Sequence, residues 1–239
     1  MFPIKDDNPL RRTPWLTMGV IATNVVVFLW QLGEGAKTGY GILEYAMVPR
    51  ALAAALGLEA PPVVSREALA LYLAYDPAVP IPFTVFTSMF MHGGWWHLLG
   101  NMWSLWIFGN NVEDEVGPEG FLAFYLACGA AAALTQAFVN LSSPVPMVGA
   151  SGAIAGVLGA YLLRFPHARI LTVIPIFLAW LVWIPASVWL VIWFLGQIMN
   201  SLASSGAGVA WYAHIGGFVA GMVLGPVFMG ARRRRAPRR

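Results

Sequence analysis

Apolar runs long enough to cross a membrane recur along this chain. A helix needs about 20 apolar residues to span a hydrocarbon core of about 30 Å. Six candidate spans can be marked: 15–32, 95–112, 120–139, 151–163, 170–195 and 209–229. Charged residues make up only 10% of the sequence, compared with about 25% in soluble domains. The sequence therefore predicts an all-α polytopic membrane protein, with a single domain over residues 1–239 built as a bundle of six transmembrane helices.

Positive charge gathers near the two ends of the chain. Arg11 and Arg12 precede the first apolar run, and residues 230–239 form an arginine-rich tail. Basic segments beside a span stay on the cytoplasmic side, so we expect residues 1–14 and 230–239 to be cytoplasmic, which an even number of spans permits. The net charge of +3 is then explained by topology and contact with anionic lipid rather than by binding to nucleic acid. We expect an integral protein of the bacterial inner (cell) membrane.

The segment between the first two runs, residues 33–94, is rich in proline and is broken by short apolar stretches. Two of these stretches, residues 51–58 and 68–75, are too short to cross a membrane. We expect them to form short interfacial helices in or on the outer leaflet. The whole segment is thus predicted to be an extracytoplasmic loop.

The fourth apolar run is the shortest, because residues 151–163 would form only about 20 Å of helix. The preceding residues, 141–150, contain two prolines and a glycine, which predicts irregular backbone that dips inward from the outer face. Such backbone is tolerated at membrane depth only where protein buries it or water reaches it. Ser151 should therefore lie at a helix N-terminus, about 10 Å below the outer surface, beside a wet cavity.

Polar side chains on two other runs share this depth. His97, Asn101 and His214 are expected about 4, 10 and 7 Å below the outer surface, at 1.5 Å per helical residue. Polar residues inside a membrane are costly, face the bundle interior and mark functional sites. Each has a plainer interpretation: His214 as a hydrogen-bond link between helices, Asn101 as a cap on a carbonyl, and the serine as part of a small-residue packing face. With no carboxylate or thiolate at this depth to complete a metal site, we expect neither metal nor cofactor.

The four residues together suit acyl transfer. A serine hydroxyl becomes a good nucleophile when a base removes its proton, and His214 is the candidate base for Ser151. The Ser151 N–H, the Asn101 amide and the His97 ring are candidate donors to an oxyanion. Since no acidic residue lies at this depth, the sequence favours a serine–histidine dyad.

Small residues explain how the two helices would approach. They recur every fourth residue on the sixth run, as Gly217, Gly221 and Gly225, and on the fourth run, as Gly152, Gly156 and Ala160. Faces of this kind let helix backbones come close. They would bring His214 near Ser151.

The residues resemble the rhomboid family of intramembrane serine proteases, over about residues 83–225. The resemblance rests on motifs in the family's order: Gly149-Ala150-Ser151-Gly152; His92, His97 and Asn101; Ala213-His214-Ile215-Gly216-Gly217; and Gly109, Glu113 and Gly117.

The resemblance implies cleavage of transmembrane helices of membrane-protein substrates near their extracytoplasmic boundary. Ser151 would be the nucleophile and His214 the base, with His97 and Asn101 in the oxyanion hole. The structural positions implied are His92, Glu113, Gly149, Gly152, Gly217 and Gly221. Its partners would be those substrates and the lipid bilayer, with no nucleic acid, and the sequence does not give the oligomeric state.

Two positions depart from the family pattern. Phe83-Thr84 stands where many members carry tryptophan and arginine, so we expect a differently anchored first loop. Ala155 stands where many bacterial members have an aromatic residue that stacks on the histidine, which leaves the orientation of His214 open. Two rival functions also stay open: a rhomboid-like pseudoprotease that chaperones membrane-protein clients without cutting them, and a small transporter or channel.

Overall fold

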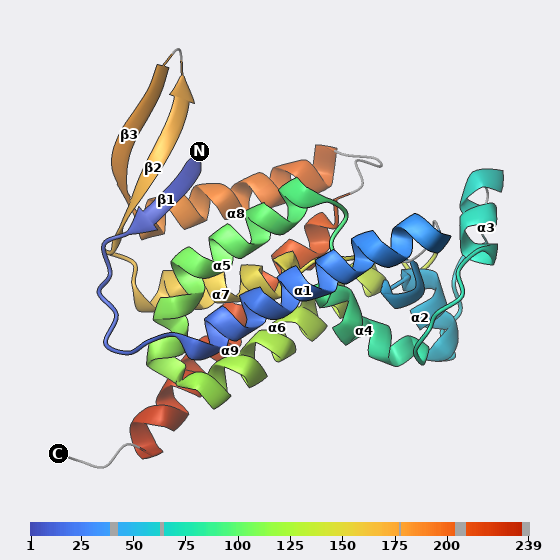
Figure 1. Ribbon diagram of the computed structural model, residues 1–239, viewed down its shortest axis with the longest axis horizontal. Coiled ribbons are helices and arrows are strands. Elements are labelled where there is room, and N and C mark those ends of the chain that lie inside the picture. Colours follow the sequence, from blue (N-terminus) through green and yellow to red (C-terminus); the bar gives the residue numbers. More distant parts are fainter. Residues whose placement is uncertain (39–42, 63–64, 177, 204–208, 236–239) are drawn as a thin grey trace.

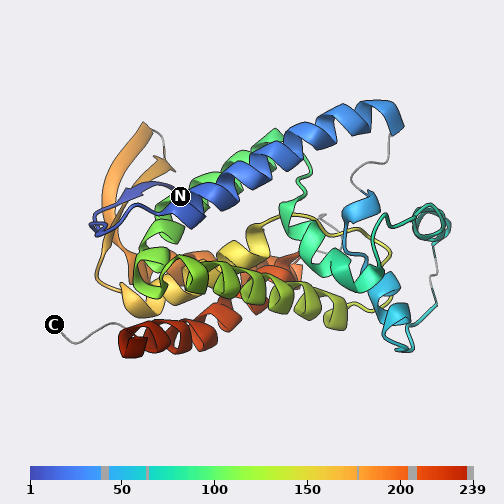
Figure 2. The same cartoon turned by 60° about the horizontal axis from the view of Figure 1, so that its bottom comes forward.

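The computed structural model describes residues 1–38, 43–62, 65–176, 178–203 and 209–235. Six long helices form the bundle: α1 (Trp15–Thr38), α5 (Trp95–Val116), α6 (Pro118–Val139), α7 (Ser151–Arg164), α8 (Ala186–Ala203) and α9 (Trp211–Arg235). Shorter helices lie in the first loop: α2 (Pro49–Ala55), α3 (Arg66–Leu73) and α4 (Thr84–Thr87), with 3-10 turns at Leu43–Tyr45, Ile81–Phe83 and Ser88–Phe90. These short helices lie at one end of the bundle, whereas the N-terminal strand and the end of α9 lie at the other (Figures 1 and 2).

Four helices of the described chain are long and apolar enough to cross a membrane: Trp15–Gly33, Pro118–Val139, Ala186–Ala203 and Trp211–Gly230. A helix stands at five of the six predicted places and covers only the second part of the remaining one, 170–195. Among the five, α7 has only 14 residues and α5 ends in the polar sequence Asn-Asn-Val-Glu-Asp-Glu-Val. The prediction of a polytopic helical membrane protein therefore holds, while the count of six spans is not established.

The prediction of an all-α fold was wrong, because a three-stranded antiparallel sheet is present. Its strands are β1 (Phe2–Asp6), β2 (Arg169–Ile176) and β3 (Leu178–Pro185), in the order β1-β2-β3. Facing pairs include Ile170 with Ile184 and Thr172 with Val182. The predicted fifth span, 170–195, is thus a β-hairpin in its first half and helix α8 in its second. The hairpin is rich in β-branched and aromatic residues, which favour strands, and hydrophobicity alone does not separate a buried strand from a buried helix.

The short helix α7 is surrounded by protein. Every residue from Gly152 to Tyr161 is buried, so the helix needs no lipid contact along this stretch. Its closest neighbour is α9: a Cβ added at Gly217 or Gly221 would collide with the carbonyl oxygen of Gly152 or Gly156 respectively. The predicted close approach through small residues is confirmed, and it brings the N-terminal ends of α7 and α9 together.

The end of α5 links the bundle to the N-terminal segment. Glu115 accepts hydrogen bonds from Arg164 at 3.0 and 3.1 Å and from Arg11 at 2.8 Å. In β1, Asp6 accepts from the hydroxyl of Tyr161 at 2.6 Å and from Asn111 Nδ2 at 2.9 Å. Burial raises the pKa of Asp6 to about 6, although the Tyr161 hydrogen bond opposes the shift. These contacts fix the sheet against the end of the bundle opposite the first loop.

The first loop is anchored by hydroxyl groups. Tyr75 donates to the carbonyl of Ala46 at 2.9 Å, and Thr87 donates to the carbonyl of Tyr45 at 2.8 Å. Thr84 is fully buried whereas Phe83 is 61% exposed. The loop therefore has anchors other than the tryptophan-arginine pair. Helices α2 and α3 lie where the two short helices are predicted, at 51–58 and 68–75, within three residues at each end. Their placement in a leaflet remains a prediction.

Candidate active site

A cavity of about 760 Å³ lies among the ends of α5, α6, α7 and α9 nearest the first loop. Its polar lining comes from Ser88, His97, Ser104, Gln136, Asn140, Ser143, Ser201 and Tyr212 together with Asn101, Ser151 and His214. No aspartate or glutamate lines it among the described residues. The polar side chains that were expected at one depth therefore line a single cavity, whose remaining walls are largely apolar.

Ser151 opens α7 after an irregular segment, as the sequence predicts. Gly149 has φ +125°, and its N–H donates to the carbonyl of Ser88 at 2.8 Å. A Cβ at Gly149 would lie 2.7 Å from His97 Nε2 and 3.7 Å from the Ser151 Oγ. Glycine is thus required here both by the backbone conformation and by the ring beside it, and the same geometry places His97 next to Ser151.

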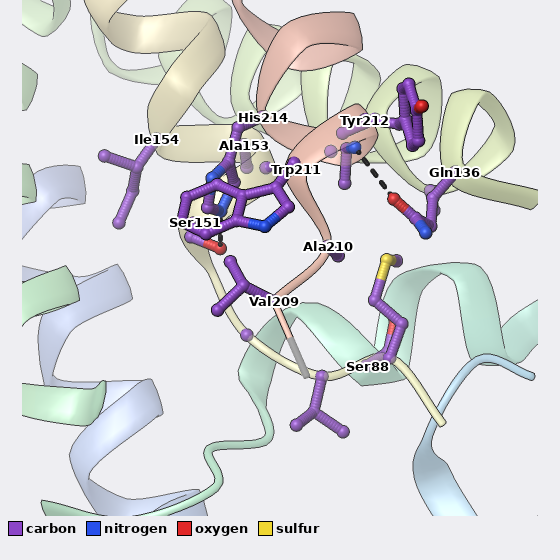
Figure 3. A pocket seen from close by; sticks show the side chains of 18 of the residues that line it. Ser88, Gln136, Ser151, Ala153, Ile154, Val209, Ala210, Trp211, Tyr212 and His214 are labelled. Atoms are coloured by element: carbon purple, nitrogen blue, oxygen red, sulfur yellow. Dashed lines mark hydrogen bonds between the residues drawn. The ribbon is translucent and has the colours of Figure 1, made fainter. Parts of the chain in front are cut away.

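His214 lies in the first turn of α9 and points at Ser151 (Figure 3). Its Nε2 is 2.8 Å from the Ser151 Oγ. The start of α9 is held by Gln136 of α6, whose side-chain oxygen accepts from the N–H of Ala213 at 3.2 Å. The predicted nucleophile and the predicted base are therefore within direct hydrogen-bond reach, which is the distance that proton transfer requires.

His97 and Asn101 lie one turn apart on α5, and both line the cavity. His97 Nδ1 accepts the N–H of Gly93 at 3.2 Å, so in the neutral ring the proton is on Nε2, the nitrogen beside Gly149. Asn101 is 6% exposed, and its Nδ2 has no hydrogen-bond partner in the part of the chain that the structure describes. His97 and Asn101 thus bring two potential donors to the cavity that Ser151 also lines, and Asn101 Nδ2 has no partner among the described residues.

His92 lies outside the cavity lining. Its ring is fully buried and edge-on to His97, with centroids 5.1 Å apart. Its backbone N–H and carbonyl pair with the side chain of Gln31 of α1 at 3.0 and 3.1 Å. His92 therefore joins the segment before α5 to α1, and Gln31 is a partner that sequence reasoning missed.

Glu113 lies near the other end of α5 and is 4% exposed. Its carboxylate accepts from the N–H of Leu16 at 3.0 Å and from the N–H and hydroxyl of Thr17, both at 2.7 Å. Carboxylates favour this position at a helix N-terminus because the first N–H groups lack partners within the helix. Glu113 thus caps α1, far along the helix from Asn101.

Sequence reasoning missed Gln197 and Trp193 of α8. Gln197 is 7% exposed, and its Oε1 lies 2.8 Å from His214 Nδ1. The Trp193 ring lies against His214, with centroids 6.1 Å apart and planes at 36°. Ala155 is fully buried, so aromatic support for the imidazole comes from α8 rather than α7. The available signal was a pair of amides, Gln197 and Asn200, in a largely apolar helix, since amide side chains inside a membrane mark functional sites.

Together, the fold and the site define a polytopic membrane protein with a serine–histidine pair at a cavity inside its helical bundle. The family model described as the Rhomboid domain matches residues 82–231, more than half of the chain. The chain belongs to the rhomboid family.

Relatives support this assignment. The chain is 32% identical over 154 residues to Rhomboid protein 1, mitochondrial, of Saccharomyces cerevisiae; the match covers 59% of this chain and 40% of that protein. RHOMBOID-like protein 5 of Arabidopsis thaliana is 31% identical over 143 residues, covering 60% of this chain and 43% of that protein. The human Presenilin-associated rhomboid-like protein, mitochondrial, is 28% identical over 160 residues, covering 64% and 33%. The chain thus matches less than half the length of these relatives. All three are eukaryotic, so they give no support to the expected bacterial membrane.

Proposed function

We propose that the protein is an intramembrane serine endopeptidase that cuts transmembrane helices of membrane-protein substrates near their extracytoplasmic boundary. The observation that carries this proposal is the 2.8 Å contact between His214 Nε2 and the Ser151 Oγ at a cavity inside an apolar bundle. A serine paired with imidazole in this way can attack a carbonyl carbon.

The residues of the cavity account for each step. His214 Nε2 takes the Ser151 proton as Oγ attacks the scissile carbonyl, and the resulting imidazolium gives that proton to the leaving amine. Water then hydrolyses the acyl-enzyme with His214 again acting as base. The oxyanion formed in each half accepts hydrogen bonds from Asn101 Nδ2, from His97 Nε2–H and from the Ser151 N–H. The proton position on His97 follows from its acceptance of the Gly93 N–H.

The topology belongs to the same proposal. The N-terminal strand and the C-terminal end of α9 lie at the same end of the bundle (Figures 1 and 2). With both termini in the cytoplasm, as the arginine tail favours, the cavity and the first loop lie toward the extracytoplasmic side. Water would enter the cavity from that side, and substrate helices would arrive from the bilayer.

Cleavage of single-span substrates by the purified protein tests the proposal. The parent should release defined fragments, whereas Ser151→Ala and His214→Ala should release none above background. Ser187→Ala and His167→Ala are matched controls: neither residue lines the cavity, and both should cut like the parent. A folded parent that binds membrane proteins without cutting any would instead be the pseudoprotease, and the proposal would be wrong.

A further inference from the structure

Gln197 links the catalytic histidine to a helix that carries neither Ser151 nor the oxyanion donors. It lies in the second half of α8, is 7% exposed, and places its Oε1 2.8 Å from His214 Nδ1. His214 therefore has hydrogen-bond partners on both ring nitrogens, Gln197 on one side and Ser151 on the other. Which nitrogen carries the proton decides whether the ring can act as a base toward the serine.

The orientation of the Gln197 amide answers that question. Its Nε2 donates to the backbone carbonyl of Trp193 at 3.2 Å, one turn earlier in α8. Rotating the amide by 180° would place the side-chain oxygen against that carbonyl, where neither atom can donate. The oxygen therefore faces His214, and an oxygen of this kind only accepts. Nδ1 must carry the proton, which leaves the Nε2 lone pair directed at the Ser151 hydroxyl.

The same turn of α8 also fixes the plane of the ring. Trp193 and Gln197 are four residues apart and so share one helix face. Trp193 packs against His214 with centroids 6.1 Å apart, and Trp211 meets the ring edge-on, with centroids 6.0 Å apart and planes at 86°. These contacts leave the imidazole little freedom to turn away from the serine.

We propose that Gln197 is a positioning residue for His214, which it holds in the Nδ1–H tautomer and oriented so that Nε2 is the base toward Ser151. The inference rests on the proposed protease function. A carboxylate in this role also stabilises the imidazolium by charge, whereas the neutral amide works through tautomer and orientation and adds no charge to the apolar bundle. Because Gln197 lies on α8 and His214 on α9, the base is fully positioned only while these two helices are packed together.

The two site histidines consequently have opposite tautomers. His97 accepts a backbone N–H at Nδ1 and so presents Nε2–H as a donor, while His214 donates from Nδ1 and presents a bare Nε2. One ring is thus prepared to stabilise an oxyanion and the other to remove a proton. The partner of Nδ1 sets the role in each case.

The test compares Gln197→Met with Asn200→Met. Asn200 makes the same bond to the carbonyl one turn back, to Gly196 at 2.7 Å, but on the exposed side of α8. Nitrogen-15 NMR of histidine-labelled protein reads the tautomer directly, with His214 assigned by its absence from His214→Asn. We expect Gln197→Met to lose the pure Nδ1–H form of His214 and to lower kcat on the order of 10-fold to 10²-fold, with KM little changed. Asn200→Met should match the parent in both readouts.

Gln197→Glu provides the rescue. Its side chain has the same length and keeps an acceptor for Nδ1–H, while the oxygen that replaces Nε2 must carry a proton to keep the bond to the Trp193 carbonyl. In that form Gln197→Glu should retain the Nδ1–H tautomer and recover most of the kcat lost in Gln197→Met, and it serves equally if Gln197→Met does not fold. An unchanged tautomer in folded Gln197→Met would overturn the proposal, as would loss of the tautomer in Gln197→Glu. The NMR readout needs no substrate, so a parent that shows the tautomer yet cuts nothing refutes the protease function and leaves the Gln197 contact standing.

Discussion

Replacing Asn101 with alanine should separate catalysis from packing. Asn101 Nδ2 makes no hydrogen bond with the described residues at rest, so the substitution breaks no bond of that nitrogen in the folded protein. An oxyanion that forms beside Ser151 would gain this donor only in the transition state. Loss of one such donor costs about 2.7 to 4 kcal/mol, which lowers kcat on the order of 10² to 10³. Substrate binding should change much less, because the interaction strengthens only as charge develops.

The assay measures kcat, KM and melting temperature for Asn101→Ala beside Ser151→Ala as the inactive reference. Asn24→Ala is the matched control, because Asn24 is a fully buried amide whose Nδ2 does bond at rest, to the carbonyl of Val20 at 2.7 Å. The control should lower the melting temperature and leave kcat nearly unchanged. Asn101→Ala should do the reverse and should still label with a serine-directed phosphonate. If Asn101→Ala melts like the parent and keeps full kcat, Asn101 is not an oxyanion donor.

Three further predictions follow from other contacts. Gly221→Ala should destabilise the fold by about 1 to 3 kcal/mol and lower activity, because its Cβ would collide with the carbonyl of Gly156. Gly196→Ala, which has open space around it, should leave stability and activity unchanged. Equal melting temperatures for the two variants would refute the close packing of α7 and α9. Burial raises the pKa of Asp6 to about 6, so the protonated side chain stabilises the fold at low pH, and this stabilisation is lost as pH rises through 6. The melting temperature of the parent, relative to that of Asp6→Asn, should therefore increase when pH is lowered from 7 to 5. A difference that stays constant with pH would contradict this. Helix α8 exposes Val188, Val191 and Ile192, and we expect it to move aside so that substrate enters the cavity laterally. Its backbone amides should therefore exchange hydrogen faster than those of α7. Equal protection of the two helices would contradict this role for α8.

Much of the helical bundle could be predicted from the sequence, because span length, proline and small-residue spacing act locally. The shortness of α7 follows from residues 151–163, and the irregular segment before it follows from its prolines and glycine. The close approach of α7 to α9 follows from small residues every fourth position, which the contact of Gly221 with Gly156 confirms. Expected depth in the membrane is the property that groups the four predicted site residues. The structure places all four on one cavity: Ser151, His97, Asn101 and His214.

The rest depends on contacts that a single sequence does not show. The run 170–195 is apolar throughout, so its division into a hairpin and α8 depends on pairing with β1, more than 160 residues away in the chain. Gln197 is a neutral amide rather than an acid, so its type does not mark it as a partner of His214, and the contact arises only when α8 packs on α9. The loop anchors, such as Tyr75 on the Ala46 carbonyl, are likewise set by tertiary structure.

The central claim is that Ser151 is a nucleophile activated by His214, and active-site labelling tests it most directly. Purified protein would be treated with a serine-directed fluorophosphonate, and the modified residue would be mapped by mass spectrometry. We predict modification of Ser151 in the parent, none in Ser151→Ala, strongly reduced modification in His214→Ala, and parent-like modification in His167→Ala, whose histidine does not line the cavity. A folded parent that is not modified at Ser151, or that is modified there equally well without His214, would contradict the account.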